Sequence, residues 1–544
     1  MDPTSAYQTP RPPTRRRLYD DVLKEPDRTG RFFRWPHPTA AAFQACARHL
    51  DCSKYNRARA SEILLRQNEA IGAPQAALDA ARDLAKPGSV CAFTGQQAGL
   101  FGGPLYTVYK ALTLLGWAER LRPILKRPVV PVFWIAADDH DFEEVRWSAF
   151  PDLENETRRV ELPATGIADR TPVSHINLTD QIRDLIAELR SQQLATEFSE
   201  PVFESLSSAY RPGASMSEAF ARWMSQLLGP LGLVMFDPSQ REGKELMRPL
   251  FEAELLGHAD SATALSEINQ RLDEAGYDRQ VSHPDGHTHL FVERQGRHAI
   301  RNNGDGTLAI ESEGEGFPAE EWINRLKSDS AAFSSGVLLR PVAQSYAFPV
   351  VATVCGPSEI AYWAQSRALF DRFNTVMPVV LPRSCATIVE HKNRRAAESL
   401  GHKVEEFFRD IEALINTHFE RSFPSDLDRT FEGERAAWEK RLAELKRIVT
   451  DFEPTLEKTF EVDAGKINNT WDHLQKKVFQ AHKRKGDEIR TRFYKLAAHL
   501  YPGGHPQERV YGIVYYLNKY GFDFIARVRE QLKIGTPEHQ IIEP

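Results

Sequence analysis

The sequence lacks any hydrophobic run long enough to span a membrane. Its longest apolar stretches are Val129–Ala137 and Phe348–Gly356, whereas a transmembrane helix needs about 20 apolar residues. Residues 1–20 are rich in Pro and Arg and contain no apolar segment of the kind that a secretory signal carries. We therefore expect no membrane partner, a cytoplasmic location, and an N-terminal extension in place of a signal.

Cysteine is scarce and charge is balanced. The chain has five cysteines, none of them in a C-x-x-C pair, so a disulfide framework is not expected. Its 69 Lys and Arg residues against 75 Asp and Glu residues give a formal net charge of −6, which gives no general reason to expect nucleic acid as a partner. With 544 residues, 41% of them hydrophobic, the chain can form several structural units and bury a large core.

Strands and helices alternate in two regions of the sequence. In the first, an apolar run at 89–93 leads through a glycine-rich turn to a helix at 104–121 and a buried strand at 129–137. This order is typical of a βαβ unit and predicts a parallel sheet with crossover helices. The second region predicts strands at Val337–Arg340, Phe348–Val354 and Val376–Leu381, with a helix at 358–373 between the last two. The fold class is therefore α/β.

The C-terminal third has a different pattern. Apolar residues recur at steps of three and four in two runs, Trp438–Leu456 and Ile467–Ala481, which predicts a helix from about 430 to 500. An earlier helix at 388–419 and a break at 422–425 complete a predicted antiparallel coiled-coil arm, which either dimerises or braces its own monomer. We divide the chain into an N-terminal extension with helices (1–88), the first part of the core (89–150), connecting or inserted α+β segments (151–330), the second part of the core (331–385), the arm (386–500), and a C-terminal segment that returns to the core (501–544).

The first candidate site is the turn TGQQAGLFGG, residues 94–103. Glycines after a strand let backbone N–H groups approach an anion, and the helix that follows favours negative charge at its start. The turn matches neither the P-loop nor the dinucleotide-binding fingerprint, and its glycines could also serve tight packing. The side-chain donors favour a ligand loop, so the candidate binding residues are Thr94, Gly95, Gln96, Gln97, Gly99 and Gly102. Lys110, in the helix that follows, is equally a phosphate partner or a solvated lysine.

The second candidate is the acidic cluster that follows the buried strand at 129–137. Asp138, Asp139, His140 and Asp141 lie at a strand end, where open α/β sheets bind ligands. A cation, an amine substrate or a proton would offset the repulsion among the carboxylates, and His140 could act as a general base. The alternative is a helix cap. We favour function, with Asp139, His140 and Asp141 as catalytic candidates; a divalent metal is a weaker alternative because three adjacent residues cannot all face one ion.

Two further strand ends carry candidate binding residues. Ser358 as N-cap, with Glu359 in the first turn, fits a helix start. Cys355 is expected to be a core residue rather than a nucleophile. Arg340 could pair with a substrate carboxylate. Gly356, Glu359, Tyr362 and Trp363 are the remaining candidates here, and core packing is favoured for the two aromatic residues. The four histidines at 283, 287, 289 and 298 match no zinc pattern and are expected at the surface.

Four blocks of the sequence resemble one known family. TGQQAGLFGGPLYTVYKAL, PVFWIAADDHDFEEV, GPSEIAYWAQ and PQERVYGIVYYLNKYG occur in this order between about residues 90 and 525. On these motifs the chain resembles the cysteine ligase family of bacillithiol synthesis, BshC. The resemblance covers most of the chain but carries little of residues 151–330 or of the N-terminal extension.

The resemblance implies a fold and an activity. The fold is a Rossmann-like core similar to nucleotidylyltransferases, with inserted connecting segments and a long coiled coil that supports a homodimer. The activity is addition of L-cysteine to glucosaminyl-malate through an amide bond. It also points to Tyr511, Asn518 and Lys519 as residues of a secondary nucleotide site beside the coiled coil. The H-x-G-H and K-M-S-K-S signatures of nucleotidylyltransferases are absent, so adenylate formation does not transfer directly; Arg383 and Ser384 are the nearest analogue of the second by position.

Amide formation from a free carboxylate requires activation, normally by ATP, and a deprotonated amine. His140 with Asp139 or Asp141 could be the base, the glycine-rich turn could hold phosphate or a carboxylate, and Arg340 could pair with malate. ATP or ADP is therefore the expected cofactor, with Mg²⁺ as an optional companion and no tightly bound metal. The AMP and ADP routes both stay open, as do two other functions: a nucleotidyl- or group-transferase acting on another small molecule, and a non-catalytic coiled-coil scaffold.

Overall fold

The computed structural model describes residues 17–484 and 486–544, which form two units. The first unit holds the described residues up to Glu390 together with His505–Pro544, and the second is His391–Gly504. Of the predicted N-terminal extension, residues 1–16 lie outside the described residues. Within the described part of the chain, no helix is long and apolar enough to cross a membrane.

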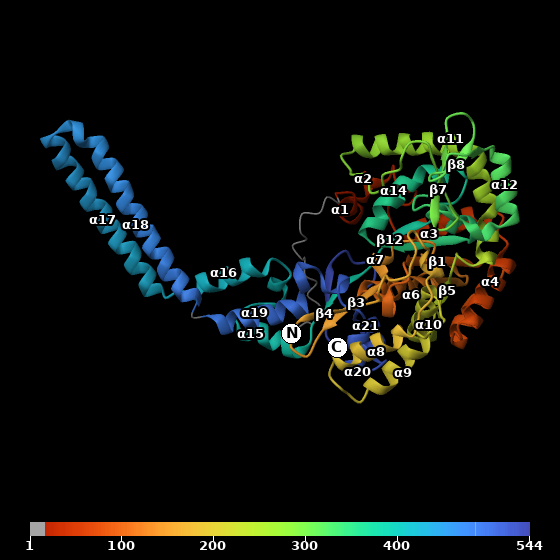
Figure 1. The fold of residues 1–544 in the computed structure, drawn as a ribbon, viewed down its shortest axis with the longest axis horizontal. Helices are drawn as coiled ribbons and strands as arrows, with labels where there is room; N and C mark the ends of the chain where they lie inside the picture. The colour runs from red at the N-terminus through yellow and green to blue at the C-terminus, as the bar shows by residue number, and fades with distance from the viewer. Residues whose placement is uncertain (1–16, 485) are drawn as a thin grey trace. The chain divides into compact units, whose positions relative to one another are not determined.

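A five-stranded parallel sheet forms the centre of the first unit (Figure 1). The strand order is β12-β11-β1-β2-β5, and every neighbouring pair runs parallel. This confirms the predicted α/β class with its parallel sheet. The strands are β1 (Val90–Gln96), β2 (Val129–Ile135), β5 (Val234–Phe236), β11 (Val350–Cys355) and β12 (Val379–Pro382).

Helices cover both faces of this sheet because alternate strand residues belong to two different cores. In β2, Val129 and Phe133 join one hydrophobic cluster, while Val130 and Trp134 join the other. The first cluster includes α3 (Ala40–Asp51), α6 (Leu105–Leu125) and α10 (Met216–Leu228). The second includes α4 (Arg57–Ala70), α11 (Arg241–Glu274), α13 (Arg340–Ala347) and α14 (Pro357–Arg372). Burial on both faces explains why β2 is apolar at every position.

A second, antiparallel sheet has the strand order β10-β6-β7-β8-β9. Its strands are β6 (His287–Glu293), β7 (Arg297–Asn302), β8 (Leu308–Ile310), β9 (Gly316–Phe317) and β10 (Phe333–Ser335). The expectation of surface histidines is wrong for His289, which is buried and bonded through Nδ1 to Oε1 of Glu254 at 3.0 Å. His283 stacks on His289, with ring centroids 4.3 Å apart.

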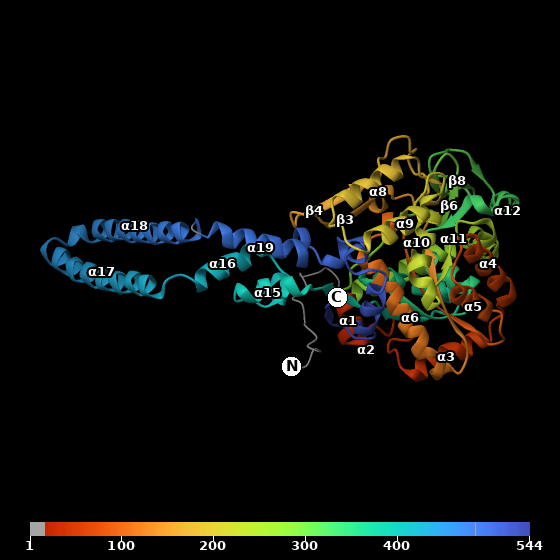
Figure 2. The same ribbon diagram turned by 90° about the horizontal axis from the view of Figure 1, so that it is seen from below.

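The second unit contains a long helical hairpin. Helices α17 (Ser425–Phe452) and α18 (Glu457–Arg484) lie side by side and antiparallel in both ribbon views (Figures 1 and 2). Phe431 contacts Trp471, and Arg435 forms an ion pair with Asp472 at 2.7 Å. The unit also holds α15 (His391–Ser399), α16 (Ile411–Arg421) and α19 (Asp487–Leu500).

The predicted coiled coil is present, but its helices differ from the prediction. The single helix expected at 430–500 is wrong: it breaks at the short turn Pro454–Leu456, where proline supplies no N–H to continue a helix. The chain therefore reverses there, so the two heptad runs pair with each other. The single helix expected at 388–419 is also wrong, because this range is divided into α15 and α16, with the short 3-10 turn Val404–Phe407 between them. Residues 385–388 just before it form β13 (Cys385–Ile388), which pairs with β14 (His539–Ile542).

The C-terminal segment packs within the first unit. Helices α20 (Val514–Tyr520) and α21 (Phe524–Gln531) contribute Leu517 and Phe524 to the same core as α6. The backbone N–H of Leu105 donates to the carbonyl of Tyr511 at 2.8 Å. This segment consequently supports the first turn of α6, next to the carboxyl ends of the sheet.

Candidate functional site

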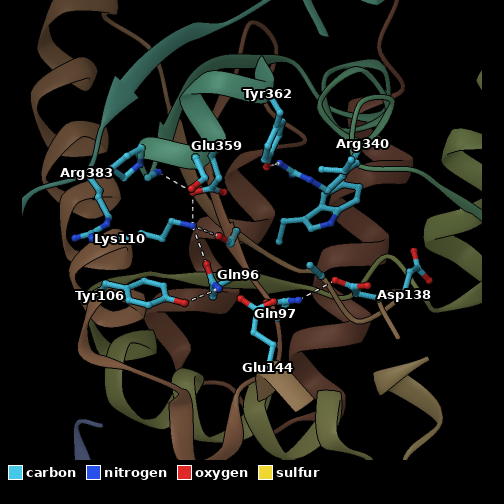
Figure 3. Close-up of a pocket in the computed structure, with 18 of the residues that line it drawn as sticks. Gln96, Gln97, Tyr106, Lys110, Asp138, Glu144, Arg340, Glu359, Tyr362 and Arg383 are labelled. Carbon is cyan, nitrogen blue, oxygen red and sulfur yellow. Dashed lines mark hydrogen bonds and ion pairs between the residues drawn. The ribbon is translucent and has the colours of Figure 1, made fainter. Parts of the chain in front are cut away.

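A cavity of about 370 Å³ lies at the carboxyl ends of β1, β2 and β11 (Figure 3). Gln96 ends β1 and Gln97 follows it, Asp138 and Asp139 come after β2, and Gly356 follows β11. Carboxyl ends of parallel strands are where open α/β sheets bind ligands. Position alone therefore makes this cavity the candidate active site.

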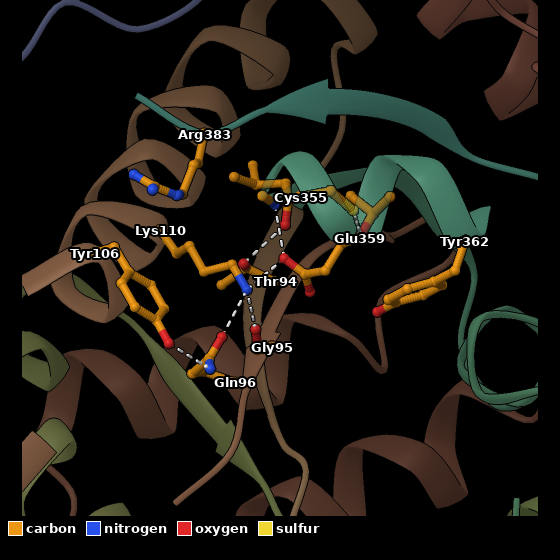
Figure 4. Close-up of polar contacts among 12 residues, drawn as sticks. Thr94, Gly95, Gln96, Tyr106, Lys110, Cys355, Glu359, Tyr362 and Arg383 are labelled. Carbon is orange, nitrogen blue, oxygen red and sulfur yellow. Dashed lines mark hydrogen bonds and ion pairs between the residues drawn. The ribbon is translucent and has the colours of Figure 1, made fainter. Parts of the chain in front are cut away.

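Lys110 is a buried cation at the base of the cavity, with 2% of its side chain exposed. Its Nζ donates to the carbonyl of Gly95 at 2.6 Å and to Oε1 of Gln96 at 2.9 Å, and it pairs with Oε2 of Glu359 at 2.5 Å (Figure 4). Burial lowers the pKa of Lys110, and Glu359 partly offsets this. The solvated-lysine alternative is wrong; Lys110 ties the turn after β1 to the start of α14.

Glu359 also closes the start of α14. Its Oε2 accepts a hydrogen bond from the backbone N–H of Gly356 at 2.7 Å. The predicted helix start with Glu359 in its first turn is therefore confirmed, but Ser358 as N-cap is wrong, because the helix begins at Pro357 and its N-cap is Gly356. The carboxylate of Glu359 also lines the cavity. Cys355 is buried, and burial raises the pKa of its thiol, as expected for a core residue.

Arg340 lines the cavity, although its predicted place at the end of a strand is wrong. It is the first residue of α13, because Pro341 suits the first turn of a helix. Its Nη2 donates to the hydroxyl of Tyr362 at 2.5 Å. Tyr362 also lines the cavity, whereas Trp363 is buried in the core and stacks on Phe370 at 5.6 Å.

Arg383 is a cavity residue that the sequence indicated only through its position. Nη2 of Arg383 pairs with Oε1 of Glu508 at 2.6 Å, and both side chains are buried. The other oxygen of Glu508 accepts from the backbone N–H of Ala386 at 3.0 Å. Figure 3 shows Arg383 beside Lys110, and Arg509 adds a further guanidinium to the lining. The adjacent charges of Glu508 and Arg509 in the block PQERVYG are the feature of the sequence that could have indicated this charged part of the cavity.

The acidic side of the cavity is held by two cations. Nζ of Lys244, itself buried, pairs with Asp138 at 2.6 Å. Asp139 accepts from Nε2 of Gln97 at 2.8 Å, and Nη1 of Arg297 lies 4.0 Å from its other oxygen. Arg297 comes from β7, so the antiparallel sheet contributes to the site. Arg297 is not among the predicted site residues, because nothing in the local sequence links residue 297 to a strand end at 135.

His140 and Asp141 are not among the described residues that line this cavity. Asp141 caps the short helix α7 (Phe142–Val145), accepting from the N–H of Glu144 at 3.2 Å. Nδ1 of His140 lies 3.9 Å from Oδ1 of Asp139. Burial, followed by the charge of Arg297, lowers the pKa of His140, which keeps its imidazole neutral. The catalytic roles of these residues stay predictions, with Asp139 best placed.

The glycine-rich turn serves two purposes. Gly95, Gln96 and Gln97 line the cavity. Oγ1 of Thr94 is instead bonded to the carbonyl of Val354 at 2.9 Å. The backbone N–H of Gly102 donates to the hydroxyl of Tyr210 at 3.1 Å. Gly102 has a φ of 95°, and a Cβ at this position would lie 3.1 Å from the side chain of Trp223. The first half of the turn thus faces the cavity, whereas Gly102 packs against core residues. Gly99 lines a second, smaller chamber.

The residues predicted for a secondary nucleotide site lie elsewhere in the first unit. Tyr511 is buried and its hydroxyl bonds to Thr157 at 2.8 Å. Asn518 donates to the carbonyl of Leu194 at 2.9 Å, and Lys519 pairs with Glu390 at 2.6 Å. These contacts brace the C-terminal segment, and the secondary site stays a prediction.

Among the described residues, no group of three or more His, Cys, Asp or Glu side chains is arranged to hold a metal ion. The acidic cluster after β2 faces Lys244, Gln97 and Arg297. A role for Mg²⁺ beside a nucleotide stays a prediction.

Comparison with known proteins places this geometry in a family. The family model for the N-terminal Rossmann-like domain of bacillithiol biosynthesis BshC matches residues 6–384, and the model for its C-terminal coiled-coil domain matches residues 386–544. A relative from Salinibacter ruber is 34% identical over 511 residues, covering 93% of this chain and 91% of its own length. A relative from Solibacter usitatus is 31% identical over 532 residues, covering 97% and 98%. Both carry the name "Putative cysteine ligase BshC". The chain belongs to the bacillithiol biosynthesis BshC family.

Proposed function

We propose that the protein is a ligase that joins the carboxylate of L-cysteine to the amine of glucosaminyl-malate, with ATP as the activating cosubstrate. The observation that carries the proposal is the distribution of charge in the cavity. Lys110 and Arg383 lie together at one end of the cavity, and Asp138 lies toward the other end, where Arg340 is also found (Figure 3). Asp139 lines the cavity as well. Guanidinium groups suit malate carboxylates and phosphates, and carboxylates suit an ammonium group.

The chemistry proceeds in two balanced steps. A carboxylate oxygen of cysteine attacks a phosphorus atom of ATP, forming an acyl phosphate with loss of ADP or an acyl adenylate with loss of pyrophosphate. The amine of glucosaminyl-malate then attacks the acyl carbon, the amide bond forms, and phosphate or AMP leaves. The amine loses one proton, which Asp139 accepts.

The basic side of the cavity suits the charge that develops on phosphate oxygens in the first step. Arg383 is held in place by Glu508, and Lys110 is held by three oxygen acceptors. Groups that are already oriented stabilise a transition state without reorganising. Their fixed positions support phosphoryl or adenylyl transfer at this side.

The helical hairpin supports a second part of the proposal, a homodimer formed through the coiled coil. Large apolar side chains stay exposed along α17, among them Ile448 at 60% and Phe452 at 87%. Exposed apolar surface of this kind marks an interaction site, and a second copy of the hairpin would bury it. Light scattering of Phe452→Glu together with Ile448→Glu should show a monomer where the unaltered protein shows a dimer; an unaltered protein that is monomeric at micromolar concentration contradicts this part.

The function is tested by mass spectrometry of products. Purified protein is incubated with glucosaminyl-malate, L-cysteine, ATP and Mg²⁺, and each component is omitted in turn. We expect a new thiol whose mass equals the two substrates minus one water, formed only in the complete mixture, with AMP or ADP released in equal amount. A product formed from another amine or acid would favour a group-transferase. A scaffold would be favoured if the Asp139→Asn variant kept its biological function in cells while the purified protein made no product in vitro.

A further inference from the structure

A second, smaller chamber of about 170 Å³ adjoins the main cavity. Five residues line both spaces and form the border between them, namely Gln96, Gln97, Tyr106, Glu144 and Arg509. Gly103 and Thr107 are among the residues that line only the smaller chamber, and we call the part of the chamber beside them its inner end. In Figure 3 the labelled border residues lie on the side of the cavity away from Arg340 and Tyr362. The site therefore has two connected compartments of unequal size.

The inner end of the side chamber presents an unpaired hydroxyl. Thr107 is fully buried, and its Oγ1 makes no hydrogen bond with any part of the chain that the structure describes. A Cβ at Gly103 would stand 3.4 Å from that oxygen, so the glycine keeps the space beside the hydroxyl open. A buried hydroxyl without a partner costs about 1–3 kcal/mol. This cost is recovered if a ligand atom bonds to Oγ1.

The border carries one charge of each sign. The side chains of Glu144 and Arg509 are both exposed, and within residues 17–484 and 486–544 neither forms an ion pair with another side chain. Both charges reach the phenol of Tyr106: burial is the main reason that its pKa rises to about 12, Glu144 raises it further, and Arg509 lowers it. A ligand with an ammonium and a carboxylate group matches this pair.

The size of the chamber limits what it can hold. Against about 370 Å³ for the main cavity, the side chamber has about 170 Å³. That volume lies well below the about 300 Å³ at which pockets for drug-sized ligands begin. An amino sugar linked to malate is too large, whereas a free amino acid with a short side chain fits.

We propose that the side chamber is the subsite for L-cysteine, an inference that rests on the proposed function. The ammonium group pairs with Glu144, and the carboxylate pairs with Arg509 at the border, where it faces the nucleotide and the amine in the main cavity. The side chain points to the inner end, and the hydroxyl of Thr107 donates to Sγ, a weak acceptor. Gly103, which has no Cβ, leaves open the space beside Oγ1 of Thr107 that the thiol would take.

The test is calorimetric binding of L-cysteine without any other substrate. Thr107→Val keeps the shape but removes the hydroxyl, and Thr107→Ser keeps the hydroxyl. We expect Thr107→Val to weaken L-cysteine binding at least fivefold and Thr107→Ser to change it less than twofold. Glu144→Gln should weaken it at least tenfold. Because Thr107→Val removes an unpaired buried hydroxyl, its melting temperature should equal or exceed that of the unaltered protein, which separates lost binding from lost folding.

Arg340→Met is the matched control, since Arg340 lines only the main cavity. It should leave L-cysteine binding unchanged and raise the KM for glucosaminyl-malate. Unchanged binding in Thr107→Val, or equal weakening in Arg340→Met, overturns the subsite. If the unaltered protein makes the amide product and Thr107→Val leaves the KM for cysteine unchanged, the subsite alone is wrong. If the folded protein neither binds L-cysteine nor makes product, the proposed function fails as well.

Discussion

Arg383 and Glu508 form a buried ion pair, with Nη2 and Oε1 2.6 Å apart, although 125 positions separate them in the sequence. Glu508 also accepts from the backbone N–H of Ala386, and Gln507 beside it bonds to the backbone of Ile388. The C-terminal segment thereby fixes the strand end that carries Arg383. Burial raises the pKa of Glu508, but Arg383 outweighs it and holds that pKa below the ordinary value.

Glu508→Gln should reduce activity through Arg383, because the amide keeps the shape but loses the charge that orients the guanidinium. We expect kcat to fall 10- to 100-fold with little change in the KM for cysteine. Glu508→Ala should also lower the free energy of unfolding by about 3–5 kcal/mol, since a buried charge is left unpaired. Denaturant unfolding and steady-state kinetics measure the two effects. Normal kcat in a folded Glu508→Gln variant would rule out a positioning role.

Lys110 makes three contacts through a single nitrogen, so its geometry matters as much as its charge. Lys110→Arg should therefore fail to restore activity, and both Lys110→Arg and Lys110→Met should lower kcat/KM at least 100-fold. The double variant Lys110→Met with Glu359→Gln removes both buried charges. It should regain part of the unfolding free energy lost in Lys110→Met while staying inactive. Recovery of activity in the double variant would contradict a direct role for Lys110.

The two aspartates on either side of His140 should behave differently. Asp139 lines the cavity and holds Gln97, whereas Asp141 caps α7. Asp139→Asn should lower the rate of product formation 10- to 100-fold with an unchanged melting temperature. Asp141→Ala should cost about 1 kcal/mol of stability, the usual value of a lost cap, with activity within threefold of the unaltered protein. The opposite ranking in a product assay would move the base from Asp139 to Asp141.

Acid should destabilise the first unit through His283. Burial, followed by the charge of His289, lowers the pKa of His283 to about 4 from an ordinary 6.5. Between these values the unfolded chain binds more protons than the folded chain, so stability is complete above pH 6.5 and is lost as pH falls toward 4. By pH 5 the free energy of unfolding has fallen, through this histidine, by at most about 2 kcal/mol from its value above pH 6.5. His283→Gln should flatten the dependence of unfolding free energy on pH in this window; the same slope as the unaltered protein would be incompatible with this assignment.

Local patterns predicted the centre of the fold, and their limits explain the errors. The glycine-rich turn between β1 and α6 and the apolar run of β2 are contiguous, so the βαβ unit could be read directly from them. The apolar run before Arg340 predicts a strand, whereas a helix starts there with Pro341 in its first turn. The regular heptad pattern likewise predicts an unbroken helix, whereas Pro454 lies in the turn at which the hairpin reverses.

Only part of the candidate site could be predicted from the sequence, for a physical reason. Gln96 ends β1, and Gln97 and Asp139 come shortly after strands of the central sheet, which brings the three together. Arg297 and Arg509 reach the same cavity from an antiparallel sheet and from the C-terminal segment. Their placement depends on tertiary packing, since no periodic pattern around either residue points toward the strand ends.

The measurement that tests the central claim most directly follows the oxygen atoms of cysteine. L-cysteine labelled with ¹⁸O in its carboxylate is incubated with glucosaminyl-malate, ATP, Mg²⁺ and the protein. If ATP activates the carboxylate, one labelled oxygen must leave with the phosphorus atom, and mass spectrometry should find ¹⁸O in phosphate or in AMP in amounts equal to the amide formed. Amide formation with no ¹⁸O in phosphate or AMP would contradict an ATP-dependent cysteine ligase. Transfer of ¹⁸O to phosphate or AMP in a control without the protein would contradict it as well.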